Sequence, residues 1–78
     1  MREVVLYTRE RCSLCRTAKA AILAVRREVP FEFREIDIGW SGALYEEHKH
    51  DIPVVEIDGK RAFKHRVDPA ALKEKLSS

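Results

Sequence analysis

The sequence predicts one small α/β domain in which strands and helices follow the order βαβαββα. Three observations lead to this prediction. A short apolar run, Glu3–Thr8, precedes a long stretch whose apolar residues recur at helical spacing. An Asp58-Gly59 pair separates two later strand-like segments. The chain has 78 residues, of which 45% are hydrophobic and 36% charged, so it can bury one core and residues 1–78 are expected to form a single domain.

The first half of the chain has the pattern of a βαβ unit. Glu3–Thr8 carries consecutive apolar side chains, which is typical of a strand buried on both faces. From Cys12 to about Arg27 the apolar residues form a stripe along one side of an amphipathic helix. The segment Phe31–Ile38 predicts a second strand, with an irregularity near Arg34-Glu35 where the alternation of apolar and charged residues breaks. Because crossovers of this kind are right-handed, the two strands are expected to be parallel.

A short helix and a hairpin follow. The segment Gly39–Asp51 predicts the helix, with Ser41 as its N-cap residue. The segments Pro53–Ile57 and Lys60–Lys64 flank Asp58-Gly59, a pair that suits the positive φ angles of a type I′ turn. These three segments therefore predict a β-hairpin.

A final helix closes the chain. Asp68-Pro69 places a capping carboxylate and a proline at the start of an apolar pattern that ends at Leu76. The hairpin can bury its apolar residues only by extending the sheet of the first two strands. We therefore expect a four-stranded mixed sheet with helices on both faces.

Composition excludes several classes of protein. Fifteen Lys and Arg against thirteen Asp and Glu leave a formal charge of +2, which is too balanced to indicate a nucleic-acid partner. The longest apolar run, Ala20–Val25, is far shorter than the roughly 18 residues that span a bilayer, and no leader-like segment precedes the first strand. We expect a cytoplasmic monomer that binds neither nucleic acid nor membrane. The sequence contains no Asn or Gln and many charged residues, a composition that favours a thermophilic source.

The pair Cys12 and Cys15 carries the chemistry that the sequence suggests. Cys12 lies at the N-terminal end of the best-predicted helix, where free backbone N–H groups and the helix dipole stabilise an anion. Its pKa is therefore expected to lie below the ordinary thiol value of about 8.5, and the nearby Arg9, Arg11 and Arg16 act in the same direction. Cys15 lies one turn further on, within reach of Cys12 but more enclosed, so it is the natural resolving thiol.

Two other functions remain open from the residues alone. The cysteines could belong to a metal-binding module that holds zinc, with His48 and His50 as further ligands, or that bridges an iron–sulfur cluster between two chains through Cys12. The chain could also be a redox-inactive adaptor that binds a peptide along the Ile52-Pro53 edge.

Three features together carry a resemblance to a known family: the stretch Tyr7–Cys15, the segment Asp51-Ile52-Pro53 and the βαβαββα order. The chain resembles a glutaredoxin-like protein of the thioredoxin-fold superfamily over essentially its whole length. It is closer to glutaredoxin than to thioredoxin, because it lacks the Trp-Cys-Gly-Pro-Cys motif and the extra strand and helix that begin a thioredoxin. The resemblance implies a small thiol–disulfide oxidoreductase with a role in electron transport and no tightly bound cofactor.

The resemblance also implies roles for single residues. Cys12 would be the nucleophile and Cys15 the resolving thiol. Arg9 would correspond to the glutaredoxin lysine three residues before the first cysteine and would favour an anionic substrate, such as the carboxylates of glutathione. Pro53 would be cis and opposite the cysteines, and Ile52 would offer its backbone to a peptide-like substrate.

The sequence departs from the family pattern at two places. Ser13-Leu14 stands where glutaredoxins have Pro-Tyr, and Leu14 is expected either to pack on its helix or to contact a protein substrate. Phe63–Arg66 lacks the Gly-Gly pair that helps to admit glutathione, and Asp68 could repel a substrate carboxylate or share its helix N-terminus with it. Glutathione is thus a doubtful partner, and the alternatives are a disulfide-containing protein as substrate and an external dithiol as reductant.

Overall fold

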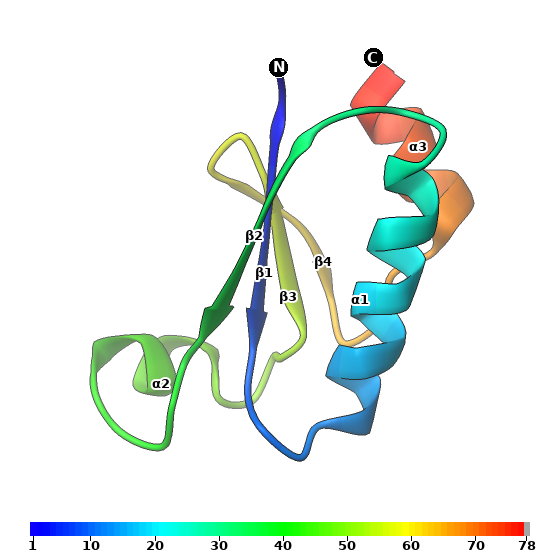
Figure 1. Cartoon of the computed structure of the whole chain (residues 1–78). Coiled ribbons are helices and arrows are strands. Elements are labelled where there is room, and N and C mark those ends of the chain that lie inside the picture. The colour runs from blue at the N-terminus through cyan, green and yellow to red at the C-terminus, as the bar shows by residue number, and fades with distance from the viewer. Residues whose placement is uncertain (78) are drawn as a thin grey trace.

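The computed structural model describes residues 1–77, and their element order confirms the predicted βαβαββα arrangement (Figure 1). The elements are β1 (Glu3–Thr8), α1 (Ser13–Arg26), β2 (Glu32–Asp37), α2 (Ala43–His48), β3 (Val54–Ile57), β4 (Lys60–Lys64) and α3 (Pro69–Ser77). Within this part of the chain, no helix is long and apolar enough to cross a membrane.

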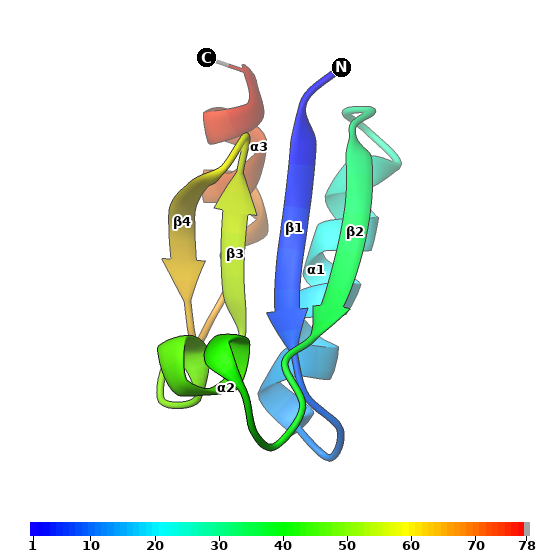
Figure 2. The same cartoon turned by 90° about the vertical axis from the view of Figure 1, so that its left-hand side faces the viewer.

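The strands form a mixed sheet in the order β2-β1-β3-β4 (Figure 2). β1 pairs in parallel with β2 and antiparallel with β3, and β3 pairs antiparallel with β4. β1 is therefore a central strand, which explains its run of apolar residues, whereas β2 lies at an edge and carries mostly charged ones. The four-stranded mixed sheet is confirmed.

The main core lies between the sheet and the two longer helices. Val4 and Leu6 of β1 are fully buried in one cluster with Ile22 of α1 and Leu72 of α3. On the other face of the sheet, Tyr7 stacks its ring on His48 of α2, with 4.4 Å between the ring centroids. α1 and α3 thus cover one face and the short α2 covers one end of the other face, as Figures 1 and 2 show.

The predicted irregularity at Arg34-Glu35 is wrong, because β2 pairs with β1 over its whole length without a shift. Phe33 and Ile36 are an odd number of positions apart, so a regular strand places them on opposite faces of the sheet. The alternation therefore breaks in the sequence while the strand stays regular. The register shift in the described sheet lies instead between Val55 and Glu56, where β3 pairs with β4.

The prediction of Ser41 as the N-cap of α2 is also wrong. Gly42 occupies that position with φ 99°, a conformation that residues other than glycine rarely adopt, and no side chain of residues 1–77 caps the helix. The Gly42 carbonyl accepts the first helical hydrogen bond, from the Glu46 N–H at 3.0 Å. The helix therefore begins one residue later than the sequence suggests.

The predicted hairpin turn and the predicted cap of α3 are both confirmed. Asp58 and Gly59 have φ angles of 51° and 84°, as a type I′ turn requires. The Asp68 carboxylate accepts a hydrogen bond from the Ala70 N–H at 3.1 Å, ahead of a helix that begins at Pro69. Local turn chemistry fixes both features.

Candidate active site

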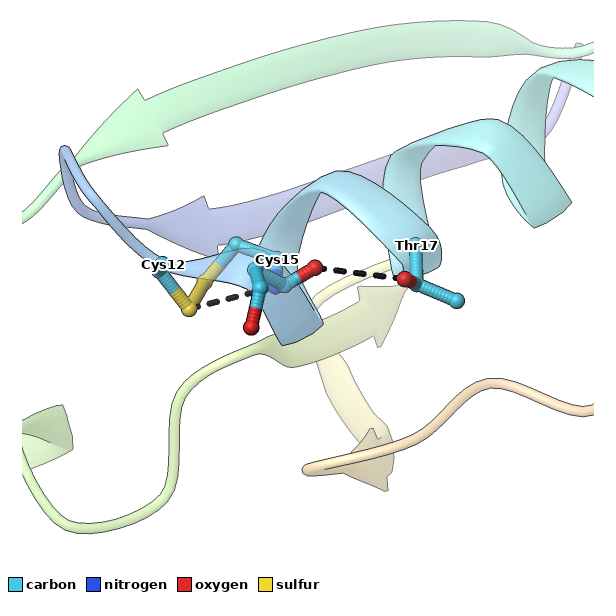
Figure 3. The surroundings of a disulfide bond; sticks show 4 residues. Cys12, Cys15 and Thr17 are labelled. Atoms are coloured by element: carbon cyan, nitrogen blue, oxygen red, sulfur yellow. Dashed lines mark hydrogen bonds between the residues drawn. A yellow bond between two sulfur atoms is a disulfide. The ribbon is translucent and has the colours of Figure 1, made fainter.

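Cys12 and Cys15 are joined by a disulfide bond at the start of α1 (Figure 3). Cys12 is the N-cap residue, with an extended backbone, and its Sγ accepts a hydrogen bond from the Cys15 N–H at 3.1 Å. The Cys12 carbonyl accepts from the Arg16 N–H at 3.2 Å. One cysteine thus satisfies backbone donors of the first helical turn with both its sulfur and its carbonyl.

The two sulfurs differ in access to solvent. Cys15 is only 2% exposed, whereas Cys12 is half-buried at the mouth of the site. Between them Ser13 is exposed and Leu14 is 38% exposed, and the Ser13 carbonyl accepts from the Thr17 hydroxyl at 3.2 Å. The geometry allows an incoming disulfide to reach Cys12 and shields Cys15.

The Ile52–Pro53 peptide bond is cis, as the resemblance implies. Val54 pairs with Tyr7, so Pro53 lies at the end of the sheet from which the chain runs toward Cys12. The Ile52 N–H donates to the His48 carbonyl at 3.1 Å. Because its N–H is already engaged, Ile52 can offer a substrate backbone its carbonyl but not its N–H.

Arg9 lies against the aromatic residues around α2. Its guanidinium carbon is 4.1 Å from the centre of the Trp40 ring and 5.8 Å from that of Tyr45. Its Nε is buried and has no hydrogen-bond partner among residues 1–77. Stacking of this kind fixes a guanidinium by cation–π attraction. Arg9 is therefore held toward α2, and its predicted contact with a substrate carboxylate stays a prediction. Nothing local in the sequence brings Trp40 to Arg9, so these contacts could not be predicted from the sequence.

A groove of about 450 Å³ adjoins the disulfide on the side of β2. It lies where the β1–α1 loop, the first turns of α1 and the end of β2 meet. Its lining residues are mostly charged: Thr8, Arg9, Glu10, Arg11, Cys12, Cys15, Arg16, Lys19, Glu35 and Asp37. Both cysteines line this groove, so a molecule bound in it would lie beside the two residues of the disulfide.

A smaller, more apolar groove of about 270 Å³ lies between α1 and the segment that leads to α3. Its lining includes Leu14, His65 and Asp68. His65 has φ 68°, the conformation that glycine favours, and its N–H donates to the Pro53 carbonyl at 2.8 Å. The chain thus keeps a glycine-like backbone where the resemblance leads one to expect glycine, but adds an imidazole to it. The carboxylate of Asp68 already accepts from the helix N–H of Ala70.

The two histidines that were predicted as possible zinc ligands, His48 and His50, do not lie together in a metal site. His48 is 2% exposed and stacked on Tyr7, and its Nδ1 lies 3.5 Å from Arg61, while His50 is exposed. Over residues 1–77, no group of three or more His, Cys, Asp or Glu side chains is arranged to hold a metal ion. A cluster bridging two chains through Cys12 stays a prediction.

Comparison with known proteins identifies relatives over nearly the whole chain. The family model described as "Glutaredoxin-like domain (DUF836)" matches residues 3–77. A protein of Dictyostelium discoideum named "Glutaredoxin-like protein YDR286C homolog" is 43% identical over 68 residues, covering 80% of this chain and 63% of that protein. The chain therefore spans less than two thirds of the length of this relative.

Solved structures share the fold. The NMR structure of protein Ne2328 from Nitrosomonas europaea has a TM-score of 0.71 at 21% identity, covering 96% of this chain and 91% of that one. The thioredoxin of Fasciola hepatica has a TM-score of 0.62 at 20% identity, covering 97% of this chain and 78% of that one. These similarities confirm the thioredoxin-like fold that the sequence predicts.

Proposed function

This chain belongs to the glutaredoxin-like domain family (DUF836), and on that premise we propose that it is a small thiol–disulfide oxidoreductase. The observation that carries the proposal is the Cys12–Cys15 disulfide at the first turn of α1, with the Cys12 Sγ accepting the Cys15 N–H. A sulfur in that place exchanges readily between disulfide and thiolate, because the donors that contact it stabilise negative charge.

Cys12 is the attacking residue in this proposal, and Cys15 the resolving one. Cys12 is the more accessible sulfur and caps the helix, whereas Cys15 is buried behind it. When the disulfide is reduced, the helix N-terminus and the nearby arginines lower the pKa of the Cys12 thiol below its ordinary value of about 8.5. More of the nucleophilic thiolate is then present near neutral pH.

The reaction proceeds in two exchanges. The Cys12 thiolate attacks one sulfur of the substrate disulfide. A Cys12–substrate disulfide forms, the substrate S–S bond breaks, and the other substrate sulfur leaves as a thiolate that takes a proton from water. Cys15, having given its proton to water, then attacks the Cys12 Sγ and releases the second substrate thiolate. Two electrons have passed from the protein to the substrate, and Cys12 and Cys15 are again joined.

We assign the partners by this chemistry. The substrate is a protein disulfide or a low-molecular-weight disulfide of the glutathione type, and an external dithiol or glutathione returns the two electrons. No tightly bound cofactor is needed, because the cysteines carry the electrons themselves. In this role the protein acts as a monomer in the cytoplasm. The exposed Leu14 supports contact with a protein substrate, because it stands between the two cysteines in the chain and also lines the small apolar groove.

The test measures the alkylation rate of the reduced protein against pH, together with reduction of bis(2-hydroxyethyl) disulfide. In Cys15→Ser only Cys12 is titrated, and we expect half-maximal reactivity roughly one pH unit or more below the ordinary thiol value of about 8.5. Cys12→Ser, the matched control, leaves the buried Cys15 and should react slowly and reduce nothing. A Cys12 that titrates like free cysteine, in a wild-type protein unable to reduce the model disulfide, would remove the oxidoreductase assignment.

A further inference from the structure

His65, which directly follows β4, has a backbone conformation that is costly for a residue with a side chain. Its φ angle is 68°, in the left-handed region that glycine favours. The residue is exposed, so burial of its side chain does not offset this cost. Such conformations persist where other contacts of the residue fix them, and they are common at functional sites. The contacts of His65 therefore indicate what the histidine does.

Both the imidazole and the backbone of His65 contact the segment 50–53. The imidazole Nε2 lies 2.9 Å from the His50 carbonyl oxygen. Because a carbonyl oxygen only accepts hydrogen bonds, Nε2 carries the proton and donates it. The His65 backbone N–H lies 2.8 Å from the Pro53 carbonyl oxygen and 3.2 Å from that of Asp51. Three carbonyls of this segment thus accept hydrogen bonds from one residue.

These contacts fix the chain on both sides of Ile52. The Ile52 carbonyl is the fourth carbonyl of the segment and stands between those of Asp51 and Pro53. The Ile52 N–H is bonded in turn to the His48 carbonyl at 3.1 Å. Since the neighbouring peptide groups are held, rotation of the backbone about Ile52 is restricted. The direction of the Ile52 carbonyl is therefore set in part by His65.

His65 lies on the side of this segment that leads to the cysteines. It lines the small apolar groove together with Leu14, which stands between Cys12 and Cys15 in the chain. Figure 2 shows that β4 runs toward the end of the sheet where α2 and the start of α1 lie. The hydrogen bond from the imidazole to His50 is thus made close to the proposed reaction and not at a remote part of the fold.

Resting on the proposed oxidoreductase function, we infer that His65 is a positioning residue for peptide disulfides. Its imidazole holds the His50 carbonyl and thereby keeps the Ile52 carbonyl in the direction in which it accepts an N–H from the backbone of the substrate. His65 acts through Ile52 and adds no step to the exchange of thiolate and disulfide described above. Its effect is confined to substrates with a peptide backbone, because backbone pairing needs an amide N–H on the substrate.

The experiment compares two neutral disulfides. One is the disulfide of N-acetyl-Ala-Cys-Ala-amide, which has peptide groups on both sides of its sulfur. The other is bis(2-hydroxyethyl) disulfide, which has none. Each is mixed with the reduced protein, and the thiol released is measured by acid quenching and chromatography. The quantity reported is the ratio of the peptide rate constant to the small-disulfide rate constant, because a change in Cys12 itself alters both rates together.

Three substitutions of His65 isolate the imidazole. His65→Gly removes the ring and suits the φ angle, and His65→Asn tolerates this angle but ends one bond short of Nε2. We expect both to lower the ratio roughly fivefold, which corresponds to the weakening of about one hydrogen bond to the substrate. His65→Gln places its amide nitrogen as many bonds from Cβ as the imidazole Nε2 and should keep most of the ratio. The urea midpoint of His65→Gly should stay close to that of the wild type, because relief of the backbone offsets the lost hydrogen bond.

His50→Ala is the matched control. It removes an exposed imidazole from the same segment but keeps the His50 carbonyl that accepts from His65. Its ratio should equal that of the wild type. The dependence of Cys12 alkylation on pH should be the same in all these variants, because the donors at the first turn of α1 are unchanged.

The outcomes separate this role from the function on which it rests. An unchanged ratio in His65→Asn overturns the role of the imidazole, and a loss confined to His65→Gly assigns the effect to backbone flexibility instead. The role is also overturned if His65→Gln loses as much as His65→Asn, if His50→Ala loses as much, or if the titration of Cys12 shifts with the ratio. In each of these cases the oxidoreductase stands. If the wild type reduces neither disulfide, the proposed function itself fails.

Discussion

Tyr7 connects three elements through the two ends of its side chain. Its ring stacks on the buried His48 of α2, and its hydroxyl donates to the Glu56 carboxylate of β3 at 3.1 Å. Burial, and then the bond to Glu56, raise the pKa of the Tyr7 phenol above its ordinary value. The raised pKa means that the folded protein holds this proton more tightly than the unfolded chain does.

Tyr7→Phe tests the hydroxyl while keeping the ring. We expect a loss of about 0.5–1.5 kcal/mol in the free energy of unfolding at pH 7, because one hydrogen bond disappears and the stack on His48 stays. In the wild type, the stability that comes from the raised pKa is fully present below about pH 10 and declines as pH rises through the folded value. Urea unfolding at pH 7 and at rising alkaline pH checks both effects. Equal alkaline loss of stability in wild type and variant would contradict the second.

Sequence reasoning predicted residue roles well where the cause is local. The place of Cys12 at the N-terminal end of α1, and Asp68 as the cap of α3, follow from positions next to helical patterns. The stacking of Arg9 on Trp40 does not follow, because the thirty intervening positions must first form α1 and β2. Contacts of that kind depend on tertiary structure and leave no mark in the local pattern.

At the scale of elements, the β3–β4 hairpin is tied to the N-terminus by its turn. The Asp58 carboxylate accepts from the Glu3 N–H at 2.9 Å and from the Arg2 Nε at 2.8 Å. These two hydrogen bonds, the backbone one first, lower the pKa of the Asp58 carboxyl below its ordinary value. The lowered pKa means that the ionised form stabilises the fold.

Asp58→Asn separates this charge from the turn, since Asn-Gly suits a type I′ turn as well as Asp-Gly does. We expect the variant to unfold at lower urea concentration than the wild type at neutral pH. The difference should be present above about pH 4, the ordinary range of an aspartate, and vanish as pH falls through the lowered folded pKa. Glu74→Gln, which removes an exposed carboxylate from α3, is the matched control and should show no such pH-dependent difference. If Asp58→Asn were less stable than the wild type by the same amount at every pH, the loss of stability would come from the turn and not from the charge.

The elements were predictable where pattern and turn chemistry agree, and less so at their ends. The Asp58-Gly59 pair located its hairpin, and the apolar stripe located α1. The start of α2 was misplaced because serine is the commoner cap, while here the backbone at Gly42 needs a positive φ that only the folded chain reveals. The supposed irregularity in β2 arose because an edge strand can place apolar residues on both faces without bending.

At the scale of the molecule, the disulfide lies beyond one end of the hydrophobic core, and neither cysteine belongs to the core cluster. α1 carries Cys12 at its first turn and buries Ile22 between the sheet and α3 nearly three turns further on. The structure therefore separates what holds the domain together from what reacts. For a domain of this size the total free energy of unfolding is only about 4–12 kcal/mol, so one core side chain is a large share of it.

Two neighbouring residues of α1 test that separation. Ile22 is fully buried, whereas Leu23 is 36% exposed. Ile22→Ala should lower the free energy of unfolding by about 2–5 kcal/mol, and Leu23→Ala by less than about 1 kcal/mol, because only the first opens a cavity. Well below the melting temperature of Ile22→Ala, the Cys12 thiol of the reduced variant should still be alkylated with the wild-type dependence on pH. The donors at the helix N-terminus are unchanged in this variant. Thermal unfolding and the alkylation assay measure the two quantities independently. A shift in the Cys12 titration with wild-type folding intact would mean that core packing, and not the first turn of the helix alone, sets the acidity of the thiol.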